Sequence, residues 1–221
     1  MKEHRITTIR FDGHLKEREI PSFRGAVIAL SGNDPLYHNH KEDDGFQFRY
    51  PRIQYKVLDG DPALVGIDDG AVSLESLFPL GEMFKFQVGR ELRKYTVKQK
   101  DPGYFLAVEE FTGVFQFSIT NWIPFNRVNY YSWHQLRGLA QKVSFLDDIL
   151  VGNILSFYKD LGVFFARGIH AQILDMVQRN ATYKGINMVT FNLKIETDVA
   201  LPAHFGIGKG VSHGFGVVED L

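Results

Sequence analysis

The chain has no cysteine among its 221 residues, which excludes a disulfide framework and a thiolate metal site. It also has no apolar run that approaches the length needed to span a membrane. The N-terminal residues MKEHRITTIRFDG are charged and strand-like, unlike a secretory signal peptide. We therefore expect a soluble protein of the cytoplasm, with no membrane partner.

The formal net charge of -1 does not indicate whether the protein binds nucleic acid. Several stretches of the chain nevertheless lack either basic or acidic residues. Residues 59–82 hold six acids and no Lys or Arg, whereas residues 84–100 hold six Lys or Arg and one acid. Residues 121–145 contain no acid and mix three Lys or Arg with aromatic and asparagine side chains. Such a patch can bind a phosphate chain and stack its bases, but a solvated face beside core aromatics is its more common origin.

Apolar spacing predicts interleaved strands and helices in the first half of the chain. Alternation predicts strands at 6–11, 46–50, 53–57, 64–67, 84–88 and 95–97, and helical spacing predicts helices at 23–30 and 73–77. Ser22 is a candidate N-cap of the first of these helices. The tripeptide Asp101-Pro102-Gly103 is a turn signal that ends this half.

The second half shows the same mixture. Alternation predicts strands at 115–119 and 189–199. Helical spacing predicts one helix that begins at Ser144 in a capping-box-like pair with Asp147, and a second at 169–177. We interpret the fold class as α+β, with two tandem ferredoxin-like (RRM-like) βαββαβ units in residues 1–102 and 103–221. The second half shows fewer strands than this fold needs.

Residues 206–216 read GIGKGVSHGFG, with a lysine and a histidine among five glycines. Glycine weakens strands and helices, so we expect a backbone that approaches a ligand closely or adopts conformations that only glycine allows. The segment is not a dinucleotide fingerprint, because no βαβ unit follows it. It is not a P-loop either, because the spacing differs and no Ser or Thr follows the lysine.

The order G-I-G, five residues that include Lys209, then G-F-G resembles the C-terminal glycine-rich loop of the CRISPR repeat-processing endoribonucleases. The chain length, the two α+β halves and a His-bearing segment after the first helix, LYHNH at 36–40, agree with this resemblance. It implies a tandem ferredoxin-like enzyme that cuts the repeat RNA of precursor crRNA without a metal or other cofactor. The products would carry a 2′,3′-cyclic phosphate and a 5′-hydroxyl. Active-site residues vary within the family, so the resemblance does not assign them here.

His38 and His40 are our candidate catalytic residues. Attack by a 2′-hydroxyl needs a base for that hydroxyl and an acid for the departing 5′-oxygen, and histidine suits both roles near neutral pH. These are the only two histidines that lie two residues apart, and in an extended segment they would face the same side. Pro35 and Asn39 favour a loop over a helix there.

Two alternatives to this pair stay open. The pair fits a solvated loop equally well. It also fits a zinc site, which would need a third ligand such as His204 or His213. No cysteine or HExxH motif supplies one, so we expect no metal.

The glycine-rich segment is our candidate RNA-binding element, because successive backbone N–H groups and a lysine can hold phosphates. A surface turn without a ligand is its alternative. Arg24 and Arg49 are weaker candidates, and Arg49 is equally well explained as a surface arginine. The candidate RNA-binding residues are Gly206, Gly208, Lys209, Gly210, His213, Gly214, Gly216 and Arg49.

Two functions are consistent with these residues. The first is an endoribonuclease acting on repeat RNA, and the second is a non-catalytic RNA-binding subunit of a CRISPR effector complex. The second would leave the histidine pair without a role. The sequence leaves open whether effector-complex subunits, or a second copy of the chain in a homodimer, also bind.

Overall fold

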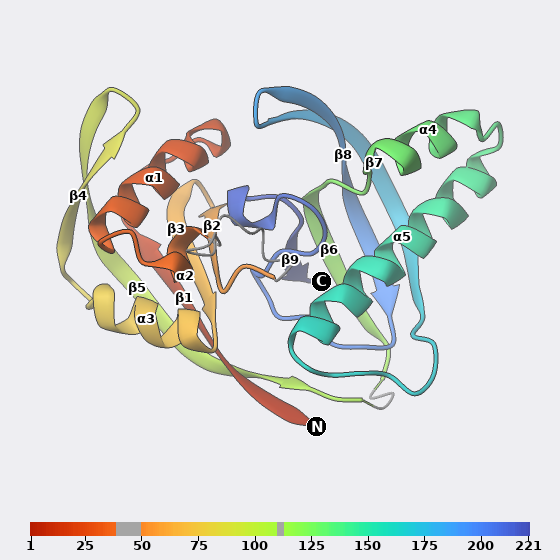
Figure 1. Ribbon diagram of the computed structural model, residues 1–221, viewed down its shortest axis with the longest axis horizontal. Helices are drawn as coiled ribbons and strands as arrows, with labels where there is room; N and C mark the ends of the chain where they lie inside the picture. The colour runs from red at the N-terminus through yellow and green to blue at the C-terminus, as the bar shows by residue number, and fades with distance from the viewer. Residues whose placement is uncertain (39–49, 110–112) are drawn as a thin grey trace. The chain divides into compact units, whose positions relative to one another are not determined.

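The computed structural model describes residues 1–38, 50–109 and 113–221, which form two compact units (Figure 1). The N-terminal unit comprises Glu3–Leu106 together with Ser212–Gly214. The C-terminal unit comprises Met1–Lys2, Ala107–Val211 and Phe215–Leu221. Among the described helices, none combines the length and apolar character needed to cross a membrane.

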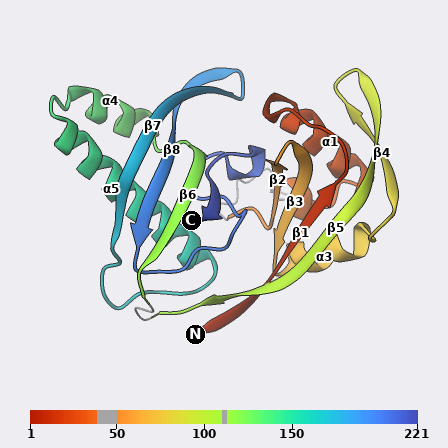
Figure 2. The same ribbon diagram turned by 180° about the vertical axis from the view of Figure 1, so that it is seen from behind.

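The N-terminal unit is a five-stranded sheet with helices on one face (Figures 1 and 2). Its strands lie in the order β2-β3-β1-β5-β4. The order β5-β1-β3-β2 is that of a ferredoxin-like unit, and β4 adds an edge strand that pairs antiparallel with β5. Its elements are β1 (Lys2–Phe11), η1 (Glu17–Glu19), α1 (Ile20–Leu30), α2 (Pro35–His38), β2 (Ile53–Leu58), β3 (Asp61–Ile67), α3 (Asp69–Leu77), β4 (Met83–Val88) and β5 (Glu91–Ala107).

Aromatic side chains form the centre of this unit. The ring of Phe11, from β1, packs edge to face against Phe23 of α1, Phe78 after α3 and Phe86 of β4, with centroids 5.4 to 5.9 Å apart. All four rings are buried. Large rings in edge-to-face contact contribute burial and a specific geometry together, and they fix α1 and α3 against the sheet.

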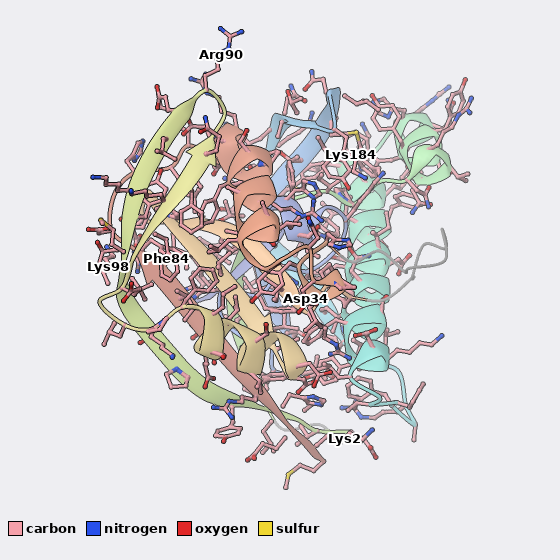
Figure 3. The ribbon with its side chains drawn as sticks, turned by 60° about the vertical axis from the view of Figure 1, so that its left-hand side comes forward. Lys2, Asp34, Phe84, Arg90, Lys98 and Lys184 are labelled. Carbon is pink, nitrogen blue, oxygen red and sulfur yellow. The ribbon has the colours of Figure 1, made fainter. Side chains whose placement is uncertain are left out.

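The predicted start of the first helix and the predicted turn at the end of this half are wrong. Ser22 lies inside α1, which begins at Ile20 with Glu19 as its N-cap. Pro21 stands in the first turn, where its fixed φ favours a helix and its missing N–H costs nothing. The turn predicted at Asp101-Pro102-Gly103 does not form, because these residues continue the long strand β5. The tip of the β4–β5 hairpin is instead at Arg90 (Figure 3).

The C-terminal unit is a four-stranded sheet in the order β7-β8-β6-β9, the ferredoxin-like order again. Helix α5 packs on β7 (Figure 2). Between β8 and β9, where all residues are described, no α-helix forms, and the glycine-rich segment takes the place of the second helix of the motif. The elements are β6 (Phe115–Trp122), α4 (Arg127–Gln135), α5 (Leu139–Asp160), β7 (Ala171–Tyr183), β8 (Ile186–Thr197), η2 (Val211–His213) and β9 (Val217–Asp220).

The helix predicted at 169–177 is wrong, since strand β7 begins at Ala171 and includes the rest of this range. Ile173 pairs with Ile195 and Asp175 pairs with Lys194, so Leu174 is the extra residue of a β-bulge. The bulge brings Ile173 and Met176 to the same face of the sheet, three residues apart, which imitates helical spacing. The predicted helix start at Ser144 is also wrong, because α5 already begins at Leu139.

Candidate functional site

The glycine-rich segment is closed at its base by backbone contacts. Gly206 forms a bridge with Val217, and the Ile207 N–H donates to the Gly216 carbonyl at 2.9 Å. Gly216 has a φ of +66°, and a Cβ there would lie 2.0 Å from the Ile207 carbonyl oxygen. Only glycine is compatible with this closure.

Four of the five glycines, Gly208, Gly210, Gly214 and Gly216, have positive φ values. A Cβ at any of these four positions would contact other atoms of the folded protein. The fold itself therefore explains why glycine occupies these positions, without any ligand. The part of these glycines in RNA binding stays a prediction.

Lys209 is the exposed cation of this segment. It follows Gly208, which rests over the buried Trp122 of β6 and Asn153 of α5. The Lys209 ammonium lies 6.0 Å from the centroid of the Tyr183 ring, at the end of β7. Lys184, at the turn of the same hairpin (Figure 3), lies 5.6 Å from that centroid. Two cations and one aromatic ring therefore meet at the end of the β7–β8 hairpin.

His38 ends a one-turn helix, not the loop that we predicted. The Leu36 N–H donates to the Asp34 carboxylate at 2.9 Å and so starts this turn. Nε2 of His38 donates to the Asn33 carbonyl at 3.0 Å, because a carbonyl can only accept. The neutral His38 ring therefore carries its proton on Nε2 and its lone pair on Nδ1.

The helix α2 is fixed to its unit by two tyrosines. The Tyr37 hydroxyl is 2.9 Å from the Ser73 hydroxyl, and the Tyr55 hydroxyl donates to the Tyr37 carbonyl at 2.9 Å. Arg24, a weaker candidate from the sequence, donates to the carbonyl of His38 at 3.1 Å. His38 is therefore on a well-supported turn, and Arg24 touches it through the backbone.

His40 and Arg49 lie outside the described residues, so their relation to His38 stays a prediction. His213 groups with the N-terminal unit, and its Nδ1 is 3.1 Å from the Ser212 hydroxyl. In the part of the chain that the structure describes, no three His, Asp or Glu side chains are grouped to hold a metal ion.

Lys56 is a titratable group that no sequence pattern singled out. It lies in β2 and is fully buried, and burial lowers the pKa of its ammonium group to about 7. Its only sequence signal is its place in an alternating strand, which is typical of an exposed lysine.

Family models match nearly the whole chain. A model described as the Cas6b N-terminal domain matches residues 2–101, and one described as the Cas6b C-terminal domain matches residues 110–221. A crystal structure of Cas6b is 23% identical over the whole of both chains, with a TM-score of 0.86.

Two further proteins are similar to the chain. A crystal structure of the CRISPR RNA processing endoribonuclease Cas6b is 24% identical, again over the whole of both chains, with a TM-score of 0.73. An uncharacterised protein of Methanocaldococcus jannaschii is 35% identical over 100 residues, which are 45% of this chain and 67% of that protein. The likeness to the solved structures confirms the α+β fold with two ferredoxin-like units.

Proposed function

Because the chain belongs to the Cas6b family, we propose that it is an endoribonuclease that cleaves precursor CRISPR RNA within its repeats. The observation that carries this proposal is the match of both family models, over residues 2–101 and 110–221. The glycine-rich segment between β8 and β9 supports it, because it presents an exposed lysine on a backbone fixed by the core.

The chemistry that we propose uses a nucleophile from the RNA. One histidine takes the proton of the 2′-hydroxyl beside the scissile phosphate, and the 2′-oxygen forms a bond to phosphorus. The bond from phosphorus to the 5′-oxygen breaks, and the second histidine gives that oxygen a proton. The products are a 2′,3′-cyclic phosphate and a 5′-hydroxyl, and the two proton transfers balance.

His38 and His40 are the proposed acid and base. The Nε2–H bond of His38 to Asn33 and the support of α2 by Tyr37 and Tyr55 give this ring a defined orientation. A catalytic imidazole benefits from such support, because proton transfer needs close and fixed geometry. Lys209 and Arg49 are the proposed cations for phosphate, and the amides of the glycine-rich segment are the proposed donors.

A cleavage assay tests the proposal directly. The protein is incubated with repeat RNA in EDTA, and the products are separated on a denaturing gel. We expect cleavage, a cyclic phosphate on the upstream product and a 5′-hydroxyl on the downstream product. Binding without cleavage, with or without added metal, would favour the non-catalytic RNA-binding subunit. Cleavage that EDTA abolishes and zinc restores would return the histidine pair to the metal alternative.

The nucleophile is tested with a single substitution in the RNA. A repeat RNA with one 2′-deoxy nucleotide just upstream of the cut lacks the attacking oxygen but keeps its charge and its bases. We expect nearly unchanged binding, because charge and stacking dominate affinity, and no cutting at that site. Efficient cutting of this RNA, or a 5′-phosphate on the product, would mean that water attacks instead.

A further inference from the structure

The C-terminal unit contains a cavity of about 540 Å³ that takes no part in the proposed proton transfers. It is lined by residues at the start of α4, by residues of the β7–β8 hairpin and by Lys209. All the residues that line it belong to this one unit. Its volume falls in the range of about 300–1,000 Å³ that is typical of pockets for small organic ligands, well above the size of a lone ion.

One wall of the cavity offers an aromatic ring that is already held in place. Tyr130 of α4 is 43% exposed and lines the cavity. Its ring packs edge to face on the buried Phe125, with centroids 5.8 Å apart, and lies 4.1 Å from the ring of His134. Nδ1 of His134 donates to the Tyr130 carbonyl at 2.9 Å, which fixes the ring pair on its helix. A rigid, half-exposed tyrosine is a stacking platform for a planar ligand.

The β7–β8 hairpin lines the cavity with two neutral amides and with the apolar side chains of Ile186, Met188 and Val189. Asn180 of β7 and Asn187 of β8 line the cavity and are exposed. Asn180 pairs with Val189, and Asn187 pairs with Thr182, so both amides stand on one face of the hairpin. An amide side chain both donates and accepts hydrogen bonds, which is the combination that the edges of nucleobases require.

The positively charged side chains around the cavity favour a ligand with a negative charge. Arg127 and Lys209 are the charged side chains among the described residues that line it, and no acidic side chain is among them. Arg127 stands in the first turn of α4, where the helix dipole disfavours a cation, and no acid in that turn offsets it. An anionic group bound between the helix start and Lys209 would offset this cost.

We propose that this cavity holds one unpaired nucleotide of the bound RNA. Its base stacks on Tyr130 and meets the amides of Asn180 and Asn187, and its phosphates contact Arg127 and Lys209. This subsite rests on the proposed function only in that the ligand is RNA, because it needs no cleavage. It would select an RNA with a nucleotide that can leave its helix, since the Watson–Crick edge is accessible only in an unpaired base.

Binding of repeat RNA to Tyr130 variants tests the subsite. Tyr130→Leu removes the stacking ring, Tyr130→Phe keeps it, and Tyr131→Leu is the matched control on the same helix, because Tyr131 is 73% exposed and does not line the cavity. We expect Tyr130→Leu to weaken binding about 5- to 100-fold, as loss of one base stack does, with little change for the other two. Equal affinities for Tyr130→Leu and Tyr131→Leu would overturn the proposal.

A second arm identifies the nucleotide and separates this proposal from a loss of folding. Each unpaired nucleotide of the repeat RNA is replaced in turn by an abasic one, and affinities are measured for the wild type and Tyr130→Leu. At one position we expect the abasic RNA to weaken binding to the wild type and leave Tyr130→Leu almost unaffected. If Tyr130→Leu loses the same factor at every position, the tyrosine acts only through the fold, and the proposal fails.

The two proposals fail in different ways. An RNA that binds through Tyr130 but is never cut would contradict the endoribonuclease and leave the subsite intact. An RNA that is cut normally, and bound equally by Tyr130→Leu and by its control, would contradict the subsite and leave the endoribonuclease intact.

Discussion

Nε1 of Trp122 donates a hydrogen bond of 3.1 Å to Oδ1 of Asn153, and Gly208 lies directly over these two atoms. A Cβ at Gly208 would lie 2.6 Å from the Asn153 oxygen and 2.7 Å from the Trp122 nitrogen. The glycine-rich segment thus packs on one hydrogen-bonded pair, Trp122 of β6 and Asn153 of α5. Lys209 is placed by this contact, because it is the next residue in the chain.

Gly208→Ala should lower the thermal unfolding midpoint through both backbone strain and a steric clash. Gly208 has a φ of +95°, and its Cβ would meet atoms of the core. Gly185→Ala is the matched control, because Gly185 has a φ of +77° and open space around it. We expect Gly208→Ala to cost about 1–3 kcal/mol more than the control, and hence several degrees, by thermal melting. Equal shifts for both variants would contradict the clash.

His38→Ala and His40→Ala should each slow cleavage of repeat RNA by about 10²- to 10⁴-fold, the usual contribution of a general acid or base. The double variant should be slowest. His14→Ala should cleave at the wild-type rate, because the His14 side chain is exposed and outside the proposed site. Single-turnover rates measure this, and a bell-shaped pH–rate profile for the wild type should accompany it. Wild-type rates for both single variants and the double would refute the assignment.

Lys209→Ala should weaken RNA binding and flatten its dependence on salt. Each phosphate that a lysine neutralises releases counterions, so removal of one contact should lower the slope of log K against log salt by about 1. Lys159→Ala in the last turn of α5 removes an equal charge from the same unit and is the control. Filter binding at several salt concentrations gives both slopes. The prediction fails if the two variants keep the wild-type slope.

Glu19 should stabilise the protein at neutral pH and lose this effect in acid. Two hydrogen bonds of 2.7 and 3.2 Å from Arg93, and one from the Lys16 N–H, lower the pKa of its carboxyl group to about 2. The unfolded value is about 4.3, so the stabilisation is complete above about pH 5 and disappears as the pH falls toward 2. We expect Glu19→Gln to cost about 1 kcal/mol at pH 7 and progressively less below pH 4.

Glu91→Gln is the control for Glu19→Gln, because Glu91 binds the same Arg93 but is 69% exposed. Its effect should be smaller at every pH. Thermal melting between pH 3 and 7 measures both variants, and a cost for Glu19→Gln that does not change with pH would show that the carboxylate is not responsible.

The sequence predicts an element well where its apolar residues keep one period. Strands β2 and β4 alternate without interruption and have the predicted places. Strand β7 could not be predicted in this way, because the bulge at Leu174 spaces Ile173 and Met176 as a helix would. Helix α2 could not be predicted either, because its four residues are held by Asp34, Ser73 and Tyr55, which the local pattern does not reveal.

The candidate site shows the same limit. The glycine-rich segment could be located from its spacing, but the reason for its glycines could not, since Asn153 and Ile20 are distant in sequence from the glycines that they exclude from substitution. The cavity beside Tyr130 was partly signalled by the acid-free residues 121–145. The hairpin that completes it is not apparent from the sequence, because the spacing of its first strand predicts a helix.

The bulge at Leu174 influences the direction of the β7–β8 hairpin, which lines the cavity. A bulge bends its strand and increases the local twist, so it sets the direction in which the far end of the β7–β8 hairpin points. The pairs on either side of it, Ile173 with Ile195 and Asp175 with Lys194, would keep their partners if Leu174 were deleted. Deletion of this one residue would therefore change the direction in which the hairpin presents Asn180 and Asn187, the two amides of the proposed nucleotide subsite.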